Sequence, residues 1–197
     1  MGLDPTAPDM TLLLVMLHTG TMFAVIVYFR RSWRDTYFAS SRALRSNGLH
    51  VALATAATGV VGLVLLQAIK HLLVGNAPGF EIEHLFGNSK LMAASLSVAG
   101  VLIIMSSRRA DTAAAELTTR SALWIGAVQG LCLPFRGLSR SGATISSGLL
   151  LGVQRRHAEE FSFALAVVLT PAVLAKEGYR FYQAHAGAAD AQGLWHL

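Results

Sequence analysis

Charged side chains are scarce in this sequence. Of its 197 residues only 14% are charged, whereas 53% are hydrophobic, and the mean hydropathy is +0.50. A chain of this composition has too little polar surface to cover a water-soluble globule. The sequence therefore predicts an integral membrane protein.

Cysteine is almost absent as well. The single cysteine, Cys132, lies inside an apolar run. One thiol supplies neither a disulfide framework nor a thiolate metal site, and in such a run it is expected to act as a small hydrophobic side chain.

Acidic residues are fewer than basic ones, and the net charge is +5. The basic residues occur in short groups between apolar runs, which is typical of cytoplasmic membrane loops and argues against nucleic-acid binding. The clearest group follows the first apolar run and is opposed only by Asp35; it contains Arg30, Arg31, Arg34, Arg42 and Arg45. We expect this loop to be cytoplasmic, in a multi-pass membrane protein.

Four apolar segments are long enough to cross a bilayer as helices, at about 20 residues for each crossing. They are residues 10–29, 49–69, 90–106 and 160–181. The predicted class is all-α, a polytopic protein in which residues 1–197 form one transmembrane domain. Residues 184–197 are expected to be a frayed end.

Two shorter apolar pieces, residues 122–133 and 143–153, flank the polar stretch PFRGLSRSG. Neither piece can span alone, and non-helical backbone at membrane depth is tolerated only inside protein or beside a water-filled cavity. The pattern favours a re-entrant pair of half-helices over residues 122–153. The alternative is one long kinked span that carries a buried arginine pair, at a cost of several kcal/mol.

The polar stretch has the features of an anion-binding helix start. Ser139 is a preferred helix cap, and Gly142 allows backbone N–H groups to point at one place. Arg140 and Arg136 add planar donor groups that match a phosphate. The alternative is an ordinary Ser/Gly turn whose arginine reaches the membrane interface.

The string GLSRSGATIS, preceded by Gln129 and Pro134 and followed by GLLLGVQRRHAEEFSFALAV, resembles the second signature of the undecaprenyl-diphosphatase (bacitracin-resistance) family. This chain has PFRG where the family more often has PG, which adds Arg136. The resemblance implies a phosphatase that converts undecaprenyl diphosphate to the monophosphate and so recycles the lipid carrier of cell-wall synthesis. It also implies inverted repeats, each with a re-entrant helix pair.

The same resemblance implies the roles of individual residues. Ser139, Arg140 and Thr144 correspond to catalytic, phosphate-contacting positions; the implied substrate-binding residues are Arg136, Ser141, Gly142 and Gln129. A divalent cation, Mg²⁺ or Ca²⁺, is implied as a cofactor, although no metal ligands can be identified in this chain. The implied partners are a polyprenyl diphosphate lipid and the membrane, and a homodimer is left open.

Two parts of the family pattern are missing. The acidic first signature, E-x-x-x-E running into FPxSSxGH, is not found in these residues, nor are the family's final spans. We expect a truncated relative whose site lacks its acidic half. Two other readings stay open: an inactive relative that only binds, and a polyprenyl-phosphate transporter or flippase, since broken helices in inverted repeats also build transporters.

Other polar residues are weaker candidates. His18 lies within the first predicted span, where we favour a packing role over catalysis. Glu81, Glu83 and His84 resemble a weak metal site on a loop, which is more often simply solvated. Glu159 and Glu160 are expected to begin the last span, where negative charge suits the helix dipole.

Overall fold

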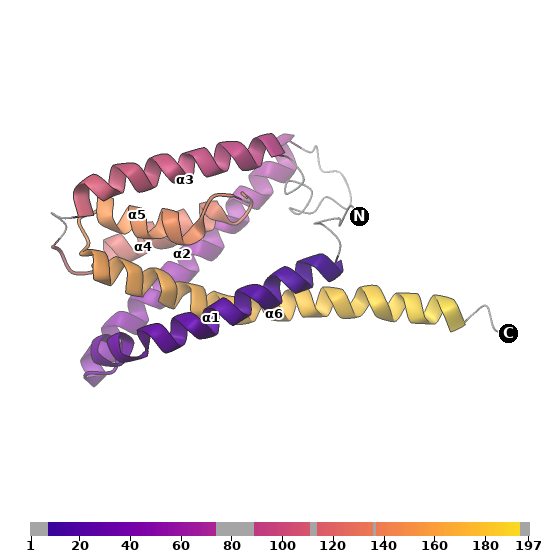
Figure 1. The fold of residues 1–197 in the computed structure, drawn as a ribbon, viewed down its shortest axis with the longest axis horizontal. Coiled ribbons are helices and arrows are strands. Elements are labelled where there is room, and N and C mark those ends of the chain that lie inside the picture. The colour runs from indigo at the N-terminus through magenta and orange to yellow at the C-terminus, as the bar shows by residue number, and fades with distance from the viewer. Residues whose placement is uncertain (1–7, 74–88, 111–113, 136, 194–197) are drawn as a thin grey trace. The chain divides into compact units, whose positions relative to one another are not determined.

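The computed structural model describes residues 8–73, 89–110, 114–135 and 137–193. In these residues the chain forms six helices (Figure 1): α1 (Pro8–Tyr37), α2 (Ser41–Leu73), α3 (Ser89–Ala110), α4 (Thr119–Cys132), α5 (Arg140–Leu150) and α6 (Arg155–Gly193). The predicted all-α class is confirmed.

The chain divides into two compact units, which are described separately. The first unit, residues 1–28 and 166–197, contains the N-terminal part of α1 and the C-terminal part of α6. The second unit, Phe29–Leu165, contains the rest of both helices together with α2, α3, α4 and α5. All the described candidate site residues lie in the second unit.

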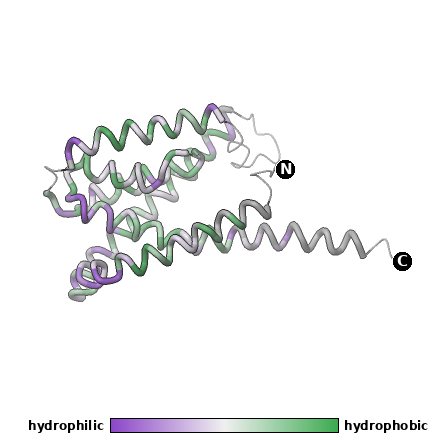
Figure 2. Tube along the Cα trace, in the orientation of Figure 1, coloured by the Kyte–Doolittle hydropathy of each residue, from purple (hydrophilic) through white to green (hydrophobic). Residues whose placement is uncertain are grey.

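Within the described ranges, three helices are long and apolar enough to cross a membrane: Ser41–His71, Ser89–Arg109 and Arg155–Lys176. They correspond to the second, third and fourth predicted spans, while the first predicted span falls within α1. Large apolar side chains such as Leu63 and Val64 on α2 and Val101 and Ile104 on α3 are exposed, as lipid contact requires. Apolar residues can be followed along α3 in Figure 2.

α6 differs from its prediction at both ends. It begins at Arg155, five residues before the predicted span, and it continues through Gly193 into the segment expected to be frayed. The C-terminal extension has a local cause, because alanine, the strongest helix former, occupies half of positions 184–193. Residues 194–197 lie outside the described part of the chain.

The short helices α4 and α5 form a hairpin, 14 and 11 residues long, at the place of the two short apolar pieces. They pack against each other, α4 packs against α2, and α5 packs against α3. The turn between them contains Gly137, whose φ of +100° suits glycine. A Cβ atom there would lie 2.9 Å from the carbonyl oxygen of Met92, so the turn also fits closely against α3.

Backbone hydrogen bonds join the two ends of this hairpin. The N–H of Ala115, before α4, donates to Gly152 at 3.0 Å, and the N–H of Gln154, after α5, donates to Ala115 at 2.9 Å. Gly152 makes the necessary turn with a φ of +84°. The chain therefore enters and leaves the hairpin at one place, which we call the hairpin base.

α2 and α4 approach so closely that only small residues fit between them. A Cβ atom on Gly126 would lie 2.6 Å from the Cα of Ala54, and the Thr58 hydroxyl donates to the Gly126 carbonyl at 2.9 Å. Elsewhere in α2, a Cβ atom on Gly62 would meet Leu133, whereas nothing lies within 4 Å of a Cβ built on Gly59. The neighbouring core consists of Ala54, Ala122, Ile125, Phe161 and Leu165.

Candidate functional site

The polar turn opens onto a capped helix, as the sequence predicted. The Ser139 hydroxyl accepts a hydrogen bond from the N–H of Gly142 at 3.1 Å, so α5 begins at Arg140. A Cβ atom on Gly142 would lie 2.9 Å from the Ser139 Oγ atom and 3.2 Å from Ile103. Glycine at position 142 therefore allows the cap and the contact with α3 to exist together.

Four predicted site residues meet at this helix start, which is the end of the hairpin opposite its base. We call Ser139, Arg140, Ser141 and Gly142 the hairpin tip. Arg140 is half-buried and lies near the Cys132 thiol at the end of α4. The first turn of a helix presents backbone N–H groups and a partial positive charge, so the tip suits an anion. Arg136 lies outside the described residues.

Thr144 does not point out of the helix start with these residues. Its side chain is fully buried, and its hydroxyl contacts the Arg140 carbonyl at 2.8 Å and shares a 2.6 Å hydrogen bond with Ser162 of α6. Because position 144 lies one turn into α5, its side chain faces the neighbouring helix. The structure therefore places Thr144 in the contact between α5 and α6.

Gln129 is also buried in a helix contact. Its Nε2 atom lies 3.4 Å from the Thr58 hydroxyl, between α4 and α2, and its side chain is 0% exposed. Its Oε1 atom has no hydrogen-bond partner among the residues that the structure describes. The family resemblance implied that Gln129 binds the substrate; the structure separates it from the tip by the last turn of α4.

Glu160 is a buried carboxylate whose environment the sequence did not reveal. It is 2% exposed, pairs with the Arg156 guanidinium at 2.8 Å, and accepts hydrogen bonds from the hydroxyls of Ser32 and Thr36. The Trp33 indole N–H donates to the Glu160 carbonyl at 3.1 Å. These bonds offset the cost of burying the charge and join the end of α1 to the start of α6.

The prediction that Glu159 and Glu160 begin the last span is therefore wrong. α6 starts at Arg155, which places both glutamates in its second turn, where Glu159 pairs with Arg155 at 3.0 Å. The i,i+4 spacing of arginine and glutamate in RRHAEE is the sequence signal that would have indicated these pairs. Nearby, burial and the Glu160 carboxylate raise the pKa of the Tyr37 hydroxyl above its ordinary range.

A divalent cation does not fit the side chains that are described. Within them, no group of three or more His, Cys, Asp or Glu residues lies close enough to hold a metal ion, and the Glu160 carboxylate is already engaged. Glu81, Glu83 and His84, the weak loop candidates, lie outside the described residues. His18 is in α1, but the placement of its side chain is likewise outside the described part.

Comparison with known proteins points to one family. Residues 1–195 match the family described as bacitracin resistance protein BacA. Undecaprenyl-diphosphatase 2 of Acinetobacter baylyi is 60% identical over 194 residues, which cover 98% of this chain and 68% of that relative. Undecaprenyl-diphosphatase of Thermus thermophilus is 34% identical over 180 residues, which cover 89% of this chain and 60% of that relative.

The chain is thus a helical membrane protein with a capped helix hairpin. It belongs to the bacitracin resistance protein BacA family, as the sequence signature indicated. It spans 60% to 68% of the length of these two relatives.

The contact between Thr144 and Ser162 predicts a stability effect. Thr144→Val should lower the free energy of unfolding by about 1–3 kcal/mol, because it leaves the buried Ser162 hydroxyl without this partner. Ser147→Ala is the matched control on the same helix, since that hydroxyl bonds to Ala143 of its own helix; its loss should cost less than about 0.5 kcal/mol. Equilibrium unfolding in detergent measures both. If Thr144→Val leaves the stability unchanged but abolishes diphosphate binding, Thr144 contacts the phosphate instead, as the family resemblance implied.

Proposed function

We propose that this chain acts in the hydrolysis of undecaprenyl diphosphate to undecaprenyl phosphate and inorganic phosphate in the bacterial inner membrane, with the diphosphate bound at the hairpin tip. Membership of the BacA family and the similarity to two undecaprenyl-diphosphatases support the reaction. The observation that best supports placing the diphosphate at the tip is the capped start of α5, where Arg140 is the first helical residue and Ser139 is the cap.

The tip offers several donors to a diphosphate. The Ser139 hydroxyl accepts its bond from Gly142, so its own proton is available for a phosphate oxygen. The first N–H groups of α5 point out of the same helix end, and the Arg140 guanidinium supplies a fixed positive charge with a planar donor face. Together these groups match the charge and the acceptor oxygens of a diphosphate.

In the proposed reaction a water oxygen attacks the terminal phosphorus, and the bond from that phosphorus to the bridging oxygen breaks. The bridging oxygen stays with the lipid phosphate, and inorganic phosphate leaves. Arg140 and the tip N–H groups stabilise the negative charge that develops on the phosphate oxygens. Because the described residues do not fit a divalent cation, no step is assigned to one.

We assign Thr144 and Gln129 a positioning role. Thr144 holds α5 to α6 through Ser162, and Gln129 lies between α4 and α2 beside Thr58. Both residues therefore act on the tip through the helices that carry it. The inverted repeats that the family resemblance implies remain a prediction, and a homodimer remains open.

We further propose that α4 and α5 are re-entrant. Helices of 14 and 11 residues are about 21 and 16 Å long, which is less than the roughly 30 Å of hydrocarbon in a bilayer. The hydrogen bonds at the hairpin base support entry and exit on one side. That side is the cytoplasmic one in this proposal, because Arg42, which belongs to the basic group expected to be cytoplasmic, lines the same cavity as Glu116 and His157, which lie beside the hairpin base.

The re-entrant topology predicts that positions 120 and 155 are accessible from the same side of the membrane. Cys132 is first replaced by alanine, and single cysteines are placed at Arg120 or Arg155, both of which are exposed. Arg155 is preferred to Arg156 because Arg156 pairs with the buried Glu160. A membrane-impermeant maleimide should label both positions only after the cytoplasmic face is opened. Labelling of the two positions from opposite faces would contradict the proposal.

Hydrolysis is tested in a chimera, since this chain spans only part of its relatives. The matched region of the Acinetobacter relative is replaced by this chain, and phosphate release from undecaprenyl diphosphate is measured beside the unaltered relative. The chimera should be active, and Arg140→Ala should lower its kcat/KM about 10²–10³-fold, with Arg140→Lys intermediate. Arg120→Ala, at the exposed start of α4, is the charge-matched control and should have little effect. A folded but inactive chimera, or equal losses at Arg140 and Arg120, would count against the proposed function.

A further inference from the structure

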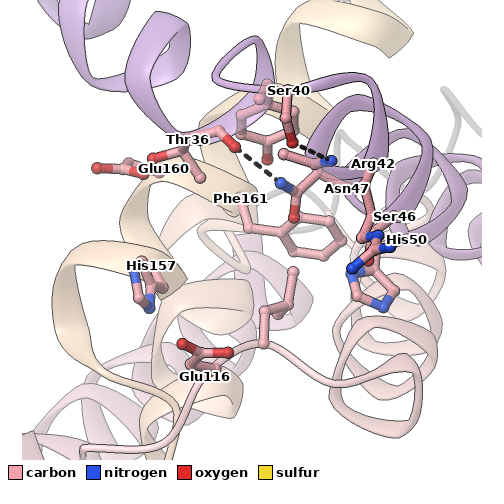
Figure 3. A pocket seen from close by; sticks show the side chains of 13 residues that line it. Thr36, Ser40, Arg42, Ser46, Asn47, His50, Glu116, His157, Glu160 and Phe161 are labelled. Atoms are coloured by element: carbon pink, nitrogen blue, oxygen red, sulfur yellow. Dashed lines mark hydrogen bonds between the residues drawn. The ribbon is translucent and has the colours of Figure 1, made fainter.

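A second polar site lies at the other end of the hairpin. An open cavity of about 420 Å³ is lined by the end of α1, the start of α2, the segment before α4 and the start of α6 (Figure 3). Glu116 and His157, which line it, flank the hairpin base at residues 115 and 153. At 1.5 Å per residue, the length of α4 separates this base from the hairpin tip by about 20 Å. The cavity is therefore distinct from the proposed diphosphate site.

Charges of opposite sign line different walls of this basal cavity. Arg42, Ser46 and His50 of α2 gather on one side in Figure 3, and Glu116 and His157 lie across from them. The other carboxylate in the lining, Glu160, is already paired with Arg156. Glu116, which is exposed, is thus the carboxylate that a bound ligand would meet. This separation of charge suits a ligand that carries both an anionic and a cationic group.

Two imidazole nitrogens at the cavity are buried without a partner. His50 is only 9% exposed, and its Nε2 atom lies 3.3 Å from the Thr119 hydroxyl, but its Nδ1 atom has no hydrogen-bond partner among the described residues. The same is true of the His157 Nδ1 atom. Buried polar atoms in native proteins are nearly always hydrogen-bonded, so a ligand in the cavity could supply the partner that each nitrogen lacks.

The depth of the cavity indicates the source of such a ligand. Two candidate membrane spans begin at Ser41 and Arg155, so the lining residues of α2 and α6 lie in the first three turns of both spans. Residues at the ends of spans lie at the level of the lipid headgroups. The volume is also within the range of small-ligand pockets, roughly 300–1,000 Å³.

We infer that the basal cavity binds the headgroup of a zwitterionic phospholipid with a primary ammonium, of the phosphoethanolamine type. In this arrangement the phosphate lies against Arg42, Ser46 and His50, with His50 donating through Nδ1. The ammonium lies against Glu116 and donates a hydrogen bond to the Nδ1 atom of His157. A trimethylammonium group has no N–H to donate, so a choline headgroup should bind less well. This inference is independent of the hydrolytic reaction at the tip.

The test is lipid binding to the purified full chain, measured by native mass spectrometry with phosphatidylethanolamine, phosphatidylcholine and phosphatidylglycerol of identical acyl chains. Phosphatidylethanolamine should bind about three- to tenfold more tightly than either of the others, the range expected for one charge-assisted hydrogen bond at a partly exposed site. Soluble phosphoethanolamine should displace it. Equal binding of the three lipids, or equal displacement by inorganic phosphate, would overturn the inference.

Matched variants separate a built site from general attraction to a basic surface. Arg42→Gln and Glu116→Gln should each weaken phosphatidylethanolamine binding about threefold or more. Arg45→Gln removes the same charge one turn further along α2, and Glu159→Gln removes a carboxylate that pairs with Arg155, so both should bind like the wild type. Ser46→Trp keeps every charge and fills the cavity, and it should abolish the preference while thermal stability is unchanged. If Arg42→Gln and Arg45→Gln lose the same affinity for phosphatidylethanolamine, the lipid is attracted to the basic surface in general, and the inference is overturned.

Discussion

The hairpin that carries the candidate site depends on one backbone interaction, the pair of hydrogen bonds that joins Ala115 to Gly152 and Gln154. This bridge holds the two ends of the hairpin together, so α4 and α5 must run to the tip and back. Because unpaired backbone groups are costly in lipid, such short helices are stable only when other helices surround them. α2 packs against α4, and α3 packs against α5.

Side-chain hydroxyls then fix the helices around this bridge. Thr58 bonds to Gly126 between α2 and α4, Ser106 bonds to Ser146 between α3 and α5, and Thr144 bonds to Ser162 between α5 and α6. Helix contacts in membranes rely on small residues and such polar bonds, since lipid removes most of the hydrophobic driving force. The direction of the α5 start, and so of Arg140, follows from bonds on two sides of that helix.

The features that the sequence predicted are those that local chemistry determines. Ser139 caps α5 because it directly precedes the helix, where its side-chain oxygen is within reach of the N–H group of Gly142. The inward direction of Thr144 was not predictable, because it depends on which neighbouring helix faces that side of α5. The surroundings of Glu160 were hidden for a related reason: Ser32 and Thr36 come from more than 120 positions earlier in the chain.

The two ends of the hairpin therefore have different chemistry, a cationic helix start at the tip and a cavity of mixed charge at the base. The central claim is that the tip holds the diphosphate through Arg140. Solid-state NMR of the chain with ¹⁵N-labelled arginine and bound undecaprenyl diphosphate measures contact between phosphorus and individual guanidinium nitrogens. In phospholipid-free detergent, the account predicts phosphorus dephasing of a guanidinium signal that Arg140→Lys removes and that Arg120→Lys leaves unchanged. Dephasing that persists in Arg140→Lys, or that Arg120→Lys removes, would contradict it.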